Sequence, residues 1–109
     1  MCRLLSLALI ILLPGITKAA TVSGVLVGGG GIDDMSLIVK AKNGQLVEAY
    51  CNRHCENWFE EDENGEVLRS EFLGRRLRMK YTFESNQDRV AGPGADEKFN
   101  FIKKIEFLP

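Results

Sequence analysis

Apolar and polar residues alternate along several stretches of the chain, which is typical of β-strands with one buried face. Residues 76–84 show the pattern most clearly, with Leu77, Met79, Tyr81 and Phe83 on one side and Arg76, Arg78, Lys80 and Thr82 on the other. Residues 22–27, 35–41 and 46–51 predict three further strands. Residues 99–108 predict a fifth, and Lys103 interrupts its apolar face, which indicates a bend or bulge there.

Glycine-rich segments separate these predicted strands. Asn43-Gly44 lies between two alternating runs and predicts a hairpin with a type I′ turn. Gly28–Gly31 is followed by two aspartates and a strand, so we expect a flexible loop there and not a phosphate-binding loop, because the carboxylates would repel phosphate. Residues 85–97 contain Gly92-Pro93-Gly94 and predict a second loop.

The spacing of apolar residues changes between residues 52 and 73. Intervals of three and four residues favour a helix, and Glu66 to Leu73 is predicted as a short amphipathic helix that ends at Gly74. The expected order is β-β-β-α-β-β, the layout of the OB-fold. The predicted fold is therefore mainly β: a five-stranded OB-fold-like barrel with one short helix between strands three and four. An SH3-like barrel is the structural alternative.

The first nineteen residues have the layout of a secretory signal peptide. Arg3 is followed by an apolar run, Leu4 to Leu13, then by Pro14-Gly15 and by small residues at Thr17 and Ala19. A ten-residue run is too short for a membrane-spanning helix, which needs about 20 residues. We expect residues 1–19 to be cleaved after Ala19, leaving a domain of residues 20–109 with no stable membrane anchor, in the periplasm or secreted.

Removing this segment changes the charge balance. The chain of 109 residues has 14 basic and 15 acidic residues and three cysteines. Residues 1–19 contain two of the basic residues and one cysteine, so the remainder has 12 basic and 15 acidic residues, a net charge of −3, and two cysteines. An exported domain with a net negative charge is not expected to bind nucleic acid.

The segment from Leu73 to Tyr81 reads Leu-Gly-Arg-Arg-Leu-Arg-Met-Lys-Tyr. It is similar to the Leu-Gly-Lys-x-Val-x-Val-x-Tyr entry into strand four of many OB-folds, and with the signal peptide the chain resembles the small secreted bacterial OB-fold proteins of periplasms. The resemblance implies an architecture and a compartment. It does not imply one function, because such barrels bind oligonucleotides, sugars or peptides. By analogy with their ligand face, the loops that contain Asp33, Asp34 and Arg89 are the expected contact region.

Cys51, His54 and Cys55 form a short cluster after the third predicted strand. In an exported protein the two cysteines are most simply one disulfide. A zinc or copper site built from Cys51, His54 and Cys55 is the alternative. A redox pair is a third interpretation, although its usual spacing is Cys-x-x-Cys.

Arg76, Arg78 and Lys80 form a basic stripe on the fourth predicted strand. We expect them to pair with glutamates on a neighbouring element; an acidic partner or an anionic surface is the alternative. His54 is the only histidine, and no serine has a nucleophile context.

The sequence thus predicts a non-enzymatic binding module without a cofactor, whose partner is an envelope protein, a glycan or a small ligand. Its alternative is a metal-binding envelope protein that uses Cys51, His54 and Cys55. The oligomeric state stays open.

Overall fold

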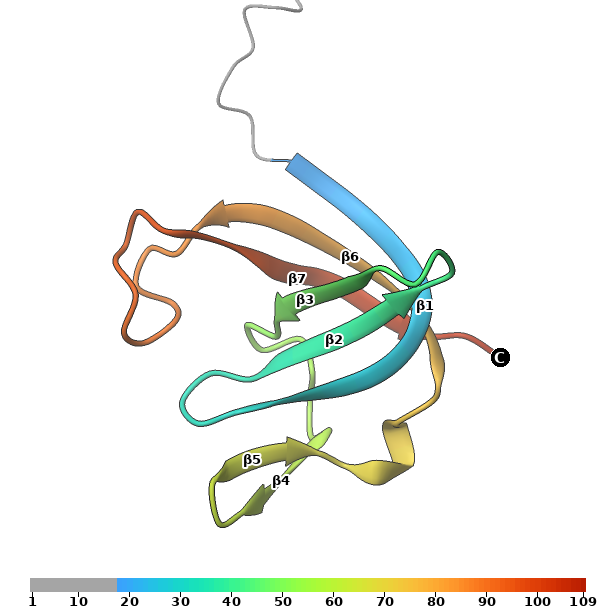
Figure 1. Ribbon diagram of the computed structural model, residues 1–109. Coiled ribbons are helices and arrows are strands. Elements are labelled where there is room, and N and C mark those ends of the chain that lie inside the picture. The colour runs from blue at the N-terminus through green and yellow to red at the C-terminus, as the bar shows by residue number, and fades with distance from the viewer. Residues whose placement is uncertain (1–17) are drawn as a thin grey trace, which may run out of the picture.

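The computed structural model describes residues 18–109, which form seven strands and one short 3₁₀ turn (Figure 1). The elements are β1 (Lys18–Gly31), β2 (Ser36–Ala41), β3 (Leu46–Tyr50), β4 (Phe59–Asp62), β5 (Gly65–Leu68), η1 (Ser70–Phe72), β6 (Arg76–Ser85) and β7 (Lys98–Phe107). The predicted signal peptide lies outside the described residues, except for Lys18 and Ala19, which begin β1.

Five of these strands close into a barrel, as predicted. The sheet order is β2-β3-β7-β6-β1, and β1 also pairs with β2, which joins the two ends. All of these pairings are antiparallel except that of β3 with β7, where Tyr50 is opposite Phe101. The architecture is consistent with an OB-fold-like barrel (Figure 1). No helix in residues 18–109 is long and apolar enough to cross a membrane.

The alternating residues fill the barrel. Leu37, Val39, Ala49, Leu77 and Met79 are fully buried, on the faces that the sequence pattern assigns to the core. The sequence also predicted an irregularity at Lys103, and this is confirmed: Lys80 is opposite Lys104 and Tyr81 is opposite Ile102, so Lys103 is the extra residue of a bulge.

The pattern fails at the end of β6. Phe83, predicted to face the core, is 48% exposed, whereas Thr82 is buried opposite Phe101. The guanidinium of Arg89, from the β6–β7 loop, lies 3.7 Å from the ring centroid of Phe101. The loop therefore covers a face that the alternation assigned to solvent.

The predicted helix at residues 66–73 is wrong. Residues 59–68 form the hairpin β4–β5, and only Ser70–Phe72 make a 3₁₀ turn. The turn between the strands, Asp62–Gly65, has a hydrogen bond of 2.8 Å from the Asn64 N–H to Asp62 Oδ1, and Gly65 has φ +134°. The helical spacing arises because separate elements each contribute apolar side chains, so that Trp58 packs on Phe72 and Phe107 with ring centroids 5.7 and 4.9 Å apart.

The expected loop at Gly28–Gly31 is also wrong, because β1 continues through all four glycines. Gly29 is opposite Leu37 on one side, and Gly31 is opposite Glu66 on β5 on the other. A Cβ atom at Gly29 would lie 2.7 Å from the Ser36 carbonyl oxygen. The missing side chains let neighbouring strands approach β1 closely at this point.

The hairpin at Asn43-Gly44 is confirmed, but its turn type is not. In this turn only Gly44 has positive φ, +87°, whereas a type I′ turn needs two such residues. The Gly44 N–H donates to the Ala41 carbonyl and the Ala41 N–H donates to the Gln45 carbonyl, both at 2.9 Å, so three residues lie between the paired Ala41 and Gln45.

Candidate functional site

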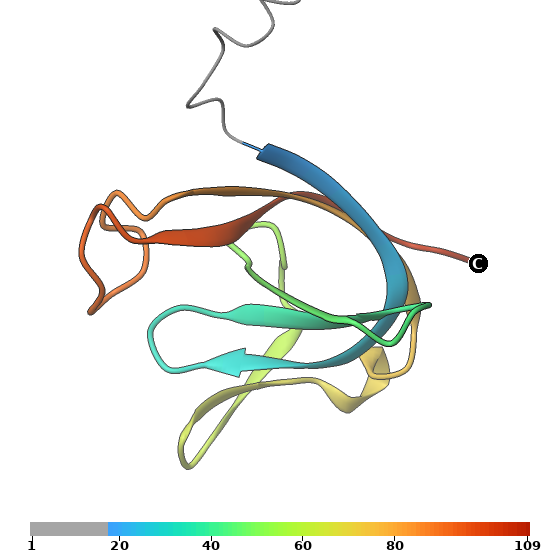
Figure 2. The same ribbon diagram turned by 45° about the horizontal axis from the view of Figure 1, so that its top comes forward.

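Three connecting segments meet at one end of the barrel: the β1–β2 loop, the turns that follow β3, and the β6–β7 loop (Figures 1 and 2). Between them lies a cavity of about 450 Å³. Asp33 and Asp34 line it from the first segment, Arg53 from the second and Arg89 from the third. The structure thus brings three of the predicted contact residues, Asp33, Asp34 and Arg89, to one site.

Aromatic side chains that the sequence pattern did not indicate as site residues also line the cavity. Tyr50 and Phe101 contact each other with centroids 6.1 Å apart, and Phe59 lines the cavity beside the disulfide turn. Burial raises the pKa of the Tyr50 phenol, and the charges of Glu48 and Asp34 raise it further. One signal for Tyr50 was present in the sequence: it is an aromatic residue at an outward position of an alternating strand.

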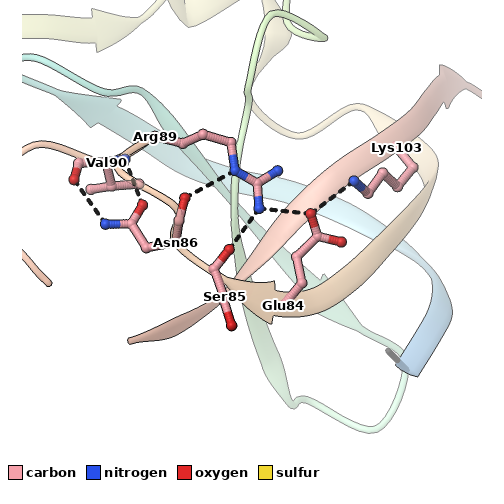
Figure 3. A network of polar contacts seen from close by, with 6 residues as sticks. All are labelled: Glu84, Ser85, Asn86, Arg89, Val90 and Lys103. Atoms are coloured by element: carbon pink, nitrogen blue, oxygen red, sulfur yellow. Dashed lines mark hydrogen bonds and ion pairs between the residues drawn. The ribbon is translucent and has the colours of Figure 1, made fainter. Parts of the chain in front are cut away.

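A single buried side chain, Asn86, organises the β6–β7 loop (Figure 3). Its Oδ1 accepts the Val90 N–H at 2.7 Å, and its Nδ2 donates to the carbonyls of Val90, Pro93 and Gly94 at 3.0, 3.4 and 3.3 Å. Its backbone N–H donates to the Glu97 carbonyl at 2.6 Å. The loop therefore has a defined shape although it contains no helix or strand.

Arg89 is held rigidly by the same loop (Figure 3). Its Nε donates to the Asn86 carbonyl at 3.1 Å, and its Nη2 donates to the Ser85 carbonyl and pairs with Glu84 Oε1, both at 2.7 Å. Together with the stacking on Phe101, these contacts fix the guanidinium at the cavity wall.

Glu84 joins Arg89 to the bulge of β7. Lys103 Nζ lies 3.0 Å from the same Oε1 atom that contacts Arg89. Partial burial would raise the pKa of the Glu84 carboxyl, but the hydrogen bonds from Lys103 and Arg89 and the charges of both outweigh it. The pKa of Glu84 is therefore lowered, and its negative charge balances part of the positive charge at this wall.

Asp34 connects the two loops on either side of the cavity. Its Oδ2 accepts the Ala91 N–H at 2.7 Å, across 57 positions of sequence. Asp33, the next residue toward the N-terminus, is exposed at the cavity rim. The aspartates that argued against phosphate binding thus have two roles here, one joining the loops and the other facing solvent.

Cys51 and Cys55 lie at disulfide distance, with Sγ atoms 2.11 Å apart and Cα atoms 5.4 Å apart. Both side chains are buried and line the cavity. They are not on a helical turn: Asn52 and Arg53 have φ +44° and +75°, and the His54 N–H donates to the Cys51 carbonyl at 2.8 Å. The pair therefore spans a tight left-handed turn.

The metal-site alternative has little geometric support. His54 is exposed on this turn, and no group of three or more His, Cys, Asp or Glu side chains in residues 18–109 is arranged to hold a metal ion. In the disulfide, neither cysteine offers a thiolate.

The basic stripe lies away from the cavity. Arg76, Arg78 and Lys80 are exposed on the outer face of β6. The predicted cross-strand pairing is present at Arg78, whose Nη1 lies 2.9 Å from Glu106 Oε1. Of the six predicted contact residues, three therefore belong to the cavity and three to a separate surface.

No family model, curated protein or solved structure matches this chain.

Proposed function

We propose that the chain is an exported, non-enzymatic binding module of the periplasm or the extracellular space, and that its ligand occupies the cavity between the β1–β2 and β6–β7 loops. The observation that carries this proposal is the direct contact of the two loops through Asp34 and Ala91 beside a cavity of about 450 Å³. Small-molecule sites commonly have volumes of about 300–1,000 Å³ and combine apolar walls with a few placed polar groups.

The chemistry of the cavity supports a ligand with both an apolar part and polar groups. Tyr50 and Phe59, which are both half-buried, supply aromatic surface. Asp33 and Arg53 add exposed charges of opposite sign at the rim. A glycan, a small polar ligand or a segment of an envelope protein meets these requirements, and these are the classes that we propose.

Two observations support a binding function over an enzymatic one. The only histidine of the chain, His54, lies on the exposed disulfide turn. No serine lies in a nucleophile motif such as Gly-x-Ser-x-Gly.

The test is a binding screen by amide NMR, with glycan fragments, short peptides and small polar compounds as probes. We expect a bound probe to shift the amide signals of Asp34, Val90 and Ala91, and Asp33→Asn with Arg53→Gln to weaken its binding. Gln45→Ala, in the turn at the other end of β2, is the matched control. Shifts that cluster away from the cavity, or turnover of a probe, would contradict the proposal.

A second measurement addresses the metal-binding alternative. Thiol titration of denatured, exported protein should find no free thiols. Two free thiols together with stoichiometric zinc or copper that is lost in Cys51→Ser would establish the alternative instead.

A further inference from the structure

The strand register gathers cations on the outer face of the barrel, away from the cavity. Directly opposite residues of paired strands share one face. One row across β7, β6 and β1 contains Lys104, Lys80 and Thr21, and the next contains Glu106, Arg78 and Ser23. A third row joins Arg76 to Val25 and, on β2, Lys40. We call these three rows the basic face; its five cations are Lys40, Arg76, Arg78, Lys80 and Lys104.

The basic face is poorly neutralised. Within its three rows, Glu106 is the only acidic residue, and it pairs with Arg78. Lys80 lies directly opposite Lys104, and like charges in this position destabilise a sheet. Cross-strand glutamates are expected along the whole stripe from the sequence, and the structure provides one. The domain has a net negative charge, so an excess of lysines does not explain why Lys80 and Lys104 lie opposite each other.

A shallow hollow of about 250 Å³ adjoins this face. Lys40, Lys42 and Arg76 line it together with apolar groups of Val25 and Leu108. Cations beside apolar side chains suit a ligand that has an anionic group next to apolar chains, such as a phospholipid.

We propose that the basic face binds the surface of an anionic lipid bilayer, with lipid phosphates between its cations. The cations extend over four strands of the barrel, and such a broad distribution of positive charge complements the many phosphates of an anionic bilayer. Proteins that bind single-stranded nucleic acid stack its bases on aromatic side chains. The three rows contain no aromatic residue, so a nucleic acid is a less suitable ligand for this face.

The test is cosedimentation of the exported protein with vesicles of phosphatidylcholine alone or mixed with phosphatidylglycerol. We expect binding to the mixed vesicles only, and loss of binding as the salt concentration rises. Lys80→Gln and Lys104→Gln should each weaken binding about fivefold, the effect of removing one cation near an anionic surface. Glu106→Gln should strengthen it.

Matched controls separate this face from the overall charge. Lys98→Gln removes an exposed lysine of β7 outside the basic face and should leave binding unchanged, as should Glu61→Gln on β4. Equal binding to both vesicle types, or equal losses in Lys98→Gln and Lys80→Gln, would overturn the proposal. Binding to a soluble acidic glycan but not to vesicles, with the same dependence on Lys80, would assign the face to a glycan and also overturn it.

Discussion

At the scale of single residues, the candidate cavity depends on polar side chains that hold backbone in place. The β6–β7 loop has neither helical nor ladder hydrogen bonds of its own, and Asn86 supplies replacements from one buried side chain. A buried amide is favourable only while its partners are present, since an unsatisfied group keeps its full desolvation cost. Loop shape and side-chain bonding at Asn86 are therefore coupled.

Replacing Asn86 should destabilise the domain and open the loop. In Asn86→Ala, the Val90 N–H and the carbonyls around the side chain lose their partners, and we expect a loss of about 2 kcal/mol in the free energy of unfolding. Denaturant unfolding measures the effect. Gln87→Ala, at the adjacent exposed position, is the control and should change stability by less than about 0.5 kcal/mol. Equal effects of the two substitutions would show that the Asn86 side chain does not organise the loop.

The lowered pKa of Glu84 predicts a pH-dependent contribution to stability. The folded state favours the carboxylate, so the contribution is complete above the pKa of an unfolded glutamate, about 4.3, and is lost as the pH falls through the lower folded pKa. The difference in unfolding free energy between the natural protein and Glu84→Gln should therefore be largest near neutral pH and shrink below about pH 4. A difference that stays constant across this range would contradict the ion-pair network.

At the scale of elements, β1 illustrates which parts of the fold the sequence could predict. Periodicity identified the buried faces of β2, β3 and β6, because apolar and polar residues alternate in a strand that has one buried face and one solvent-exposed face. It failed at Gly28–Gly31, since glycine carries no side chain to alternate and its usual preference is for turns. These glycines belong to a strand because β2 and β5 pair closely with them, and the sequence around the glycines does not indicate those pairings.

The missed hairpin β4–β5 has a similar cause. Acidic residues occupy both faces of β4, so no alternation marks it as a strand, while Trp58 and Phe72 reach the core from a turn and a 3₁₀ turn. For the candidate site, local sequence could place Asp33, Asp34 and Arg89 in loops. It could not reveal that Asp34 bonds to Ala91 or that Arg89 covers Phe101, because both contacts depend on barrel closure.

Two adjacent glycines of β1 provide a matched test of this explanation. A Cβ atom at Gly29 would lie 2.7 Å from the Ser36 carbonyl oxygen, whereas one at Gly28 would lie 3.7 Å from Ile38 Cδ1, an ordinary contact. We expect Gly29→Ala to lower the unfolding free energy by about 1–3 kcal/mol and Gly28→Ala to be neutral or slightly stabilising. Thermal or denaturant unfolding of both variants decides the point, and equal stabilities would refute the close-approach argument.

The disulfide turn should make a small contribution to stability. Cys51 and Cys55 close a very short loop, for which the entropic gain is low, so Cys51→Ala/Cys55→Ala should lose about 2 kcal/mol in denaturant unfolding. Arg53→Gly, with the disulfide intact, is the control: glycine adopts the observed φ of +75° without a side-chain penalty, so stability should be kept or rise. A loss in Arg53→Gly as large as in the double variant would show that the turn, and not the covalent link, matters.

At the scale of the whole molecule, the barrel separates three surfaces that differ in charge. The cavity at one end combines charges of both signs, and the basic face covers parts of β1, β2, β6 and β7. The exposed acids of β4 lie on the hairpin that extends the sheet beyond the barrel. A net charge of −3 for residues 20–109 therefore conceals a strongly polarised surface. Binding at the cavity and at the basic face can be tested separately because no cation of the basic face lines the cavity.

The proposed cleavage site lies within the barrel, which makes the N-terminus of the exported protein a test of both compartment and fold. Cleavage after Ala19 would remove the pairs of Lys18 with Phe83 and of Ala19 with Thr82, and would keep the ladder from Ala20 to Val25 along β6. The remaining pairs include the buried Val22, so we expect the shortened strand to stay in place. Intact-mass measurement of exported protein should give a chain that begins at Ala20, whereas a mass that includes Met1 would contradict the signal-peptide prediction.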